Sequence, residues 1–335
     1  MSMRHFTIPI FIPMEACPFR CIYCDQEKIS GHAQVPDAAE IKESIEKHLA
    51  TMPKSAEIEV GFFGGTFTGL PQEKQVALLE TVQPFIQRGQ VKSIRLSTRP
   101  DFIDDKILQV LKAHHVGTIE LGAQSMDDEV LRQSGRGHKA VVTVAAAKMI
   151  KASGFRLGLQ MMIGLPGDSA EKNRATAEAF VAMGAEDVRI YPCLIIKGTP
   201  LEKRYLDGKY QPLSLAEAVQ ITAQLFPIFE DAGIRIIRTG LHPSEGFLNG
   251  DELVAGPFHV SFKELVVTQL WNEILKQITV NKNAEEITVS VAPGQTNAAI
   301  GYGAVNKKML AANYKKVRFR QDASLQKREF YVDYR

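Results

Sequence analysis

Short apolar runs rich in β-branched residues alternate with longer amphipathic runs through the first 240 residues. The short runs predict strands, and apolar residues spaced three or four apart predict helices. We predict strands at residues 6–12, 58–63, 93–97, 118–121, 156–162, 187–191 and 234–238. Helices are predicted at residues 37–50, 71–87, 103–114, 138–153, 169–183 and 214–232. The chain is therefore expected to be an α/β protein.

Repeated strand-then-helix units imply parallel strands joined by right-handed crossovers. About six such units over residues 1–240 suit a doubly wound sheet or an open barrel. In both architectures the ligand-binding groups lie in the loops that follow the carboxyl ends of the strands. Those loops are where the unusual residues of this sequence stand.

Three of the four cysteines, Cys17, Cys21 and Cys24, fall within eight positions, spaced C-x3-C-x2-C. Three thiolates on one short loop can hold three irons of a [4Fe–4S] cluster, because such clusters take cysteine ligands. The fourth iron is then left open, and an open coordination position is where a metal site does chemistry. A partial zinc site is the alternative, with His32 as the nearby fourth ligand, although structural zinc usually takes four Cys or His ligands.

Polar and glycine residues follow the other predicted strands. Paired glycines at Gly64 and Gly65, before Thr66, let a backbone approach a ligand without a side chain in the way, or simply form a tight turn. Two glutamines, Gln124 and Gln160, end successive strands beside an arginine loop. Arginine suits a carboxylate because its planar fork binds both oxygens at once. Together these positions predict a ligand site.

The cysteine spacing, with the aromatic Tyr23 before the third cysteine, resembles the signature of the radical S-adenosylmethionine (SAM) enzymes. In that family the open iron binds the amino and carboxylate groups of SAM. An electron from the cluster breaks a carbon–sulfur bond, and the 5′-deoxyadenosyl radical takes a hydrogen atom from the substrate. The resemblance implies a partial (β/α)6 TIM-type barrel that contains a [4Fe–4S] cluster and SAM.

The series Thr98-Arg99-Pro100-Asp101, Glu120 to Ser125, Arg136-Gly137-His138 and Gly164 to Gly167 is similar to the radical domain of the Elongator catalytic subunit. It is more loosely similar to the oxygen-independent coproporphyrinogen oxidases. The resemblance covers roughly residues 5–240. This chain has a shorter gap between its first two cysteines than the Elongator subunit. About 95 residues after the barrel cannot hold an acetyltransferase domain, so that half of the Elongator chemistry is not expected here.

The resemblance also assigns roles to residues of this chain. The glycine-rich element Gly64-Gly65-Thr66 is expected to contact the amino group of SAM. Ser97 stands about where relatives often carry an acid. The remaining cofactor contacts implied by the resemblance are Tyr23 near the adenine, and Gln124, Arg136 and Gln160 at the amino acid and ribose ends.

A segment rich in Gly, His and Pro, residues 241–261, follows the last predicted strand and is interpreted as a possible lid over the site. Its His242 and His259 are candidate substrate contacts or ordinary surface residues. Cys193 follows the sixth strand and is a candidate hydrogen donor, although a buried apolar cysteine is the more frequent case.

Residues 262–335 are predicted to form a separate small, basic α/β unit. A helix at 262–278, strand 286–292, helix 304–312 and strands 316–320 and 328–334 surround a glycine-rich turn that begins at Gly301. The order resembles a KH nucleic-acid module, in which a G-x-x-G loop clamps the backbone of the bound strand. The loop is degenerate here, but Lys307 and Lys308 follow it, and residues 301–335 carry nine basic against three acidic residues. We therefore predict RNA contacts at Gly301, Lys307 and Lys308, with a solvated basic face as the alternative.

The composition, 45% hydrophobic and 23% charged, is that of an ordinary globular protein. Four cysteines without a disulfide framework predict a reducing cytoplasm, and the apolar run at residues 6–14 is too short to cross a membrane. We predict a cytoplasmic radical SAM enzyme that acts on tRNA or other RNA, reduced by a donor such as flavodoxin or ferredoxin. The alternatives are a small-molecule or tetrapyrrole substrate, or a non-catalytic iron–sulfur protein that binds RNA.

Overall fold

The computed structural model describes residues 5–12, 17, 21–31, 34–241 and 245–335. The chain divides into two compact units, residues 1–214 with 228–258, and residues 215–227 with 259–335. His32 and His242 lie outside the described residues. Of the helices in the described residues, none has the length and apolar character that crossing a membrane requires.

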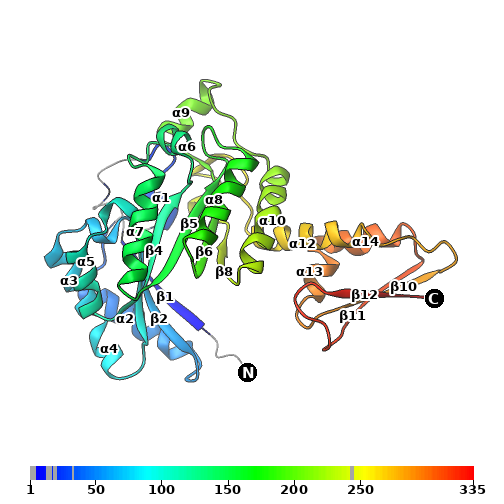
Figure 1. Ribbon diagram of the computed structural model, residues 1–335, viewed down its shortest axis with the longest axis horizontal. Coiled ribbons are helices and arrows are strands. Elements are labelled where there is room, and N and C mark those ends of the chain that lie inside the picture. Colours follow the sequence, from blue (N-terminus) through cyan, green and yellow to red (C-terminus); the bar gives the residue numbers. More distant parts are fainter. Residues whose placement is uncertain (1–4, 13–16, 18–20, 32–33, 242–244) are drawn as a thin grey trace. The chain divides into compact units, whose positions relative to one another are not determined.

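A seven-stranded, all-parallel sheet forms the centre of the first unit, in the order β1-β2-β3-β4-β5-β6-β8. The strand order never reverses, so the sheet curls as a half-barrel and the doubly wound alternative is wrong. Figure 1 shows the strands side by side with helices along their outer face. The strands are β1 (His5–Ile12), β2 (Glu57–Gly64), β3 (Ser93–Thr98), β4 (Val116–Gln124), β5 (Arg156–Ile163), β6 (Asp187–Pro192) and β8 (Arg235–Thr239).

The helices of the first unit mostly follow the predicted amphipathic runs. Helix α2 begins with a capping box, in which the Asp37 carboxylate accepts from the Glu40 backbone N–H and the Glu40 side chain accepts from Asp37. The helices are α1 (Gln26–Ser30), α2 (Ala38–Thr51), α3 (Gln72–Glu80), α4 (Gln83–Gln87), α5 (Asp105–Ala113), α6 (Asp128–Gln133), α7 (Ala140–Ala152), α8 (Ala170–Ala182), α9 (Pro200–Leu206), α10 (Leu215–Asp231), which the two units share, and α11 (Glu245–Leu248).

The single helix predicted at residues 71–87 is wrong, because the run forms two helices, α3 and α4. Pro84 has no N–H to donate, and its ring would clash with a helical carbonyl four residues earlier. Proline is tolerated in the first turn of a helix, and α4 begins at Gln83 with Pro84 in its first turn.

The second unit contains a three-stranded sheet in the order β11-β10-β12. Strand β10 (Glu286–Val291) pairs parallel with β11 (Lys316–Gln321) and antiparallel with β12 (Phe330–Tyr334). Helices α12 (Phe262–Leu275), α13 (Thr296–Ile300) and α14 (Val305–Ala311) belong to this unit, and the buried Trp271 of α12 packs in its core. The glycine-rich loop lies between α13 and α14, and the KH-like assignment of this unit stays a prediction.

Candidate functional site

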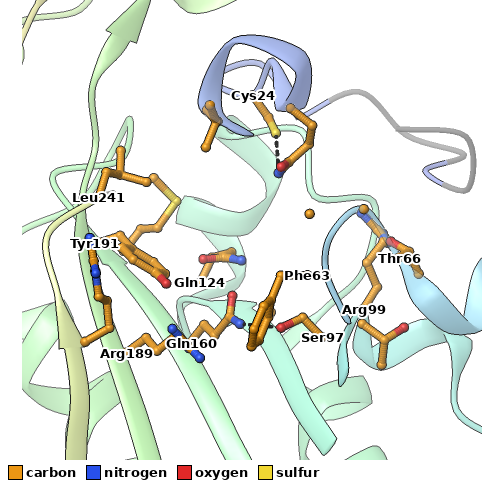
Figure 2. Close-up of a pocket in the computed structure, with 18 of the residues that line it drawn as sticks. Cys24, Phe63, Thr66, Ser97, Arg99, Gln124, Gln160, Arg189, Tyr191 and Leu241 are labelled. Atoms are coloured by element: carbon orange, nitrogen blue, oxygen red, sulfur yellow. Dashed lines mark hydrogen bonds between the residues drawn. The ribbon is translucent and has the colours of Figure 1, made fainter. Parts of the chain in front are cut away.

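A cavity of about 790 Å³ opens at the carboxyl end of the seven-stranded sheet. Every strand of that sheet contributes lining residues, and the loops after β1 and β2 close one side. In Figure 2, Cys24 lies above the cavity, Thr66 and Arg99 lie on one side, and Tyr191, Arg189 and Leu241 lie on the other. The residues assigned to the cluster and to SAM all line it: Cys17, Cys21, Tyr23, Cys24, Gly64, Gly65, Thr66, Ser97, Gln124, Arg136 and Gln160.

The three clustered cysteines line the same cavity. Each has its own polar neighbour: Cys17 Sγ lies 3.3 Å from Thr66 Oγ1, Cys21 Sγ accepts from Arg136 at 3.3 Å, and Cys24 Sγ accepts from Gln26 at 3.3 Å. Burial, followed by the Cys21 thiol, raises the pKa of Cys24 to about 12. Thiols so close in a poorly solvated site need a cation to become thiolates, as iron would provide.

Within the described part of the chain, no three His, Cys, Asp or Glu side chains are grouped as ligands of one metal ion. A [4Fe–4S] cluster would place each thiolate on a different iron. The zinc alternative named His32 as the fourth ligand, and His32 lies outside the described residues, so the zinc site stays an alternative.

Gly64, at the end of β2, is required by its packing against β1. Its φ is +111°, and a Cβ there would lie 2.5 Å from the carbonyl oxygen of Ile12. The next residue, Gly65, donates its N–H to that same carbonyl at 2.7 Å. The glycine pair therefore holds the end of β1, where the cysteine loop begins, against the end of β2.

Gln124, at the end of β4, has a strained backbone. Its φ is +69°, which is uncommon for a residue other than glycine, and the β4–β5 register shifts between Gly122 and Gln124. Its side-chain Oε1 is buried and has no hydrogen-bond partner among the described residues. Strained residues and unsatisfied buried polar atoms concentrate at functional sites, so this atom is a candidate acceptor from a ligand.

The arginine loops predicted from sequence meet beside the cluster loop. Arg99 binds both oxygens of Asp101, at 2.9 and 2.8 Å, and donates to the Arg136 carbonyl at 2.5 Å. Arg136 in turn donates to Cys21 Sγ and to the Gly122 carbonyl. Its Nε is buried without a partner among the described residues. A fixed guanidinium with an unused donor suits a carboxylate ligand.

His138 leads to a prediction about acid stability. Burial, and then the Arg136 charge, lower its pKa to about 4. In the unfolded chain this histidine takes up a proton near pH 6.5, whereas in the folded chain it does so only near pH 4. The free energy of unfolding should therefore fall as pH drops from about 6.5 to 4. Urea unfolding of His138→Gln at about pH 7 and pH 5 should show a smaller difference than the wild type. An equal difference in both proteins would contradict this.

Gln160 and Ser97 are joined to each other as well as to the cavity. Gln160 Nε2 donates to Ser97 Oγ and to Glu120 Oε2, each at 3.0 Å. The amide nitrogen of Gln160 therefore donates to protein groups. Its side-chain carbonyl is the atom proposed to contact SAM. Ser97 takes part as the acceptor from Gln160.

A buried charge network beneath the cavity is a feature that sequence reasoning missed. Arg95, with a side chain 2% exposed, binds Glu59 at 3.1 Å, Glu120 at 2.8 Å and Asp187 at 2.8 Å. Arg189 adds two hydrogen bonds to Glu120, and Arg235 binds Asp187 at 2.8 Å. Buried carboxylates of this kind are retained only when paired and hydrogen-bonded. The alternation of polar residues along β3 and β6 was the available signal.

Cys193 lies outside the cavity lining. It is 2% exposed and packs with Cys21, Tyr23 and Leu165 behind the cluster loop. Burial raises its pKa to about 12. These surroundings match the frequent buried cysteine rather than a hydrogen donor that must meet the substrate.

The segment after β8 is anchored by apolar contacts. Leu241 lines the cavity, and Phe247 is buried with Leu194 and Ile196. Strand β9 (Leu253–Ala255) pairs with the two-residue strand β7 (Ile195–Ile196). A lid role for this segment stays a prediction.

The loop between α13 and α14 has an unusual backbone. Three of its residues have a positive φ: Gly301 at +87°, Gly303 at +60° and Ala304 at +60°. Tyr302 is 46% exposed, and the ring of His259 meets it edge-on at 5.4 Å. Lys307 and Lys308 are exposed on the first turns of α14. The exposure of the Tyr302 ring was not recognised from the sequence.

Two family models match this chain. Residues 11–180 match the model of the radical SAM superfamily, and residues 185–272 match that of the Radical_SAM C-terminal domain. The chain belongs to the radical SAM superfamily of enzymes, and it is homologous to the radical domain of the Elongator catalytic subunit. Members of this family generally use a [4Fe–4S] cluster and SAM.

Individual relatives add detail. An uncharacterized protein of Methanocaldococcus jannaschii is 31% identical over 63% of this chain and 68% of its own length. A tRNA uridine(34) acetyltransferase of the same organism is 25% identical over 64% of this chain, but the match takes in only 47% of that relative. The structure of an archaeal Elp3 from Methanocaldococcus infernus aligns with a TM-score of 0.65 at 21% identity, over 85% of this chain and 66% of that one. This last likeness supports the predicted barrel fold.

Proposed function

We propose that Cys17, Cys21 and Cys24 hold a [4Fe–4S] cluster and that SAM binds in the cavity beside it. The observation that carries the proposal is the meeting in one cavity of three thiols with two buried polar atoms, Gln124 Oε1 and Arg136 Nε, that have no hydrogen-bond partner among the described residues. When bound, the cluster and SAM supply the 5′-deoxyadenosyl radical that abstracts a substrate hydrogen.

The residues of the chain have distinct tasks in this proposal. Arg136 compensates thiolate charge, because it donates to Cys21 Sγ, and offers its Nε to the carboxylate of SAM. Gln124 accepts from the amino group of SAM, and the backbone of the Gly64-Gly65-Thr66 element contacts the same group. Tyr23, 7% exposed at the cavity wall, offers its ring to the adenine.

The first test is direct. Reconstituted anaerobically and reduced with dithionite in place of the proposed flavodoxin or ferredoxin, the protein should convert SAM to 5′-deoxyadenosine. Cys21→Ala should lose bound iron and product formation together, because one iron loses its ligand. Cys193→Ala is the matched cysteine control and should keep its iron. A fully loaded wild-type protein that forms no 5′-deoxyadenosine would rule out the proposal.

RNA, and within it tRNA, is the proposed substrate. Relatives described as tRNA uridine(34) acetyltransferases support this. So does the loop at Gly301, because an exposed aromatic ring stacks on bases and nearby lysines contact phosphates. Here Tyr302 supplies the ring, and Lys307 with Lys308 supply the charge.

Binding of tRNA should therefore be salt-sensitive and depend on the second unit. Lys307→Glu with Lys308→Glu should weaken binding and reduce the slope of log affinity against log salt by about one for each lost phosphate contact. Tyr302→Ala should weaken binding while leaving the slope unchanged, because stacking releases no counterions. Lys42→Glu with Lys47→Glu, two exposed lysines of α2, is the control for the same change of net charge. Binding indifferent to salt and to these changes would favour a small-molecule substrate.

A further inference from the structure

The cavity has an unbalanced charge. Its described lining includes five arginines and no Asp or Glu. Three of the five have identified partners on the protein: Arg95 and Arg189 share buried carboxylates, and Arg99 binds Asp101. Arg136 faces the thiol of Cys21. The fifth arginine, Arg238, remains.

Arg238, on β8, stands directly beside another arginine. Arg189 of β6 and Arg238 are register partners, and both line the cavity. Like charges on opposed positions repel each other. Arg189 is neutralised by Glu120, but the hydrogen bond of Arg238 within the described residues runs from its Nε to the carbonyl of Gly240, at 3.0 Å. A half-buried cation that has no carboxylate partner among the residues described favours binding of an external anion.

Apolar and aromatic groups surround the two arginines. The Arg189 guanidinium lies 4.9 Å from the centre of the Phe63 ring, and Tyr191, Ile237 and Leu241 also line the cavity. Ligand sites typically combine such apolar walls with a few polar groups that fix orientation. This part of the cavity is therefore shaped for an organic ligand that carries an anionic group.

Thr66 of the proposed SAM site lies across the cavity from Arg189 (Figure 2), whereas Gln160, also proposed for SAM, is the register partner of Arg189. The SAM amino acid has to reach the iron that Cys17, Cys21 and Cys24 leave open, and Arg136 already contacts that loop. Figure 2 shows Arg189, Tyr191 and Leu241 across the cavity from Thr66 and Arg99. Arg238 adjoins Arg189 on the neighbouring strand.

We propose that Arg238 binds an oxyanion of the substrate, either a phosphate or a carboxylate. Arg189, its register partner, is already paired with Glu120. This inference rests on the proposed function only in placing substrate and SAM in the same cavity. A phosphate would come from a nucleotide, and a carboxylate from a small organic acid. The two sources share the chemistry of a planar guanidinium fork on paired oxygens.

The test measures binding by calorimetry on the cluster-loaded protein with SAM present. The probes are uridine 5′-monophosphate, with uridine as its phosphate-free match, and succinate, each up to about 10 mM. We expect one of the two anions to bind, and Arg238→Met to weaken it at least about tenfold. Arg238→Lys keeps the charge but loses the planar fork of the guanidinium. Its affinity for the anion should lie between those of the wild type and of Arg238→Met. Arg174→Gln, an exposed helix arginine paired with Glu178, is the control.

The outcomes separate the sources and the two proposals. Arg238-dependent binding of the nucleotide but not of uridine assigns a phosphate, and Arg238-dependent binding of succinate assigns a carboxylate. No Arg238-dependent binding of either anion overturns the inference. An equal loss of SAM affinity in Arg238→Met also overturns it, because the arginine then serves the cofactor. Wild-type protein that binds an anion through Arg238 yet forms no 5′-deoxyadenosine would refute the proposed function alone.

Discussion

Arg95→Met is expected to lower the free energy of unfolding by about 3–5 kcal/mol, the usual cost of removing one partner from a buried ion network. Arg95 binds three carboxylates at once, from Glu59, Glu120 and Asp187, and none of these three side chains is more than 6% exposed. Methionine fills similar volume but leaves those charges without their central cation. Urea or thermal unfolding of the purified protein measures the effect.

The pH dependence provides a second readout for this variant. In the wild type, burial opposes ionisation of Glu59, but hydrogen bonds and charge from His5 and Arg95 outweigh it and lower the pKa to about 2. That contribution to stability is present above about pH 4.5 and is lost as pH falls toward 2. Without Arg95 the buried carboxylates should take up protons above their unfolded pKa. The variant should therefore recover part of its lost stability on going from about pH 7 to pH 5.

Arg235→Met is the matched control, because Arg235 binds the same Asp187 but its side chain is 48% exposed. Exposed ion pairs contribute about 0–1 kcal/mol, so this variant should unfold close to the wild type. Similar losses of unfolding free energy in Arg95→Met and Arg235→Met would show that the buried Arg95 does not stabilise the network more than the exposed Arg235.

Gly64→Ala is expected to reduce the rate of 5′-deoxyadenosine formation by about a hundredfold, the effect of misplacing reacting groups by about 1 Å. An alanine Cβ would lie 2.5 Å from the Ile12 carbonyl, on backbone that cannot yield without moving the end of β1. The cysteine loop starts there, so the spacing between cluster and cofactor should change. Product formation and SAM affinity, measured together, test this.

Gly208→Ala separates the clash from backbone strain. Gly208 has a φ of +68°, yet a Cβ there would meet nothing within 4 Å. This variant should therefore lose about 1–2 kcal/mol of stability and keep its product formation. If Gly64→Ala turns over SAM as Gly208→Ala does, the close approach of β1 and β2 is not needed for the site.

The sequence by itself determined the fold class and most of the candidate site. The seven predicted strands agree with the observed strands to within three residues at each end. Parallel strands present their carboxyl ends at one edge, so residues such as Gln124 and Arg136, far apart in the chain, were expected to meet the cysteine loop. The spacing of Cys17, Cys21 and Cys24 is local, and local spacing can be read without coordinates.

Only the tertiary structure decided which charges pair, and why. Arg95 and Asp187 are 92 positions apart, and in the sequence each is one more polar residue in an alternating strand. Their pairing depends on strand register. The register shifts at Gly122/Gln124 and at Val188/Arg189 decided which side chains reach the cavity. A slip of one residue turns a side chain to the opposite face of the sheet. Arg238 therefore became a candidate ligand only when the fold placed it beside Arg189.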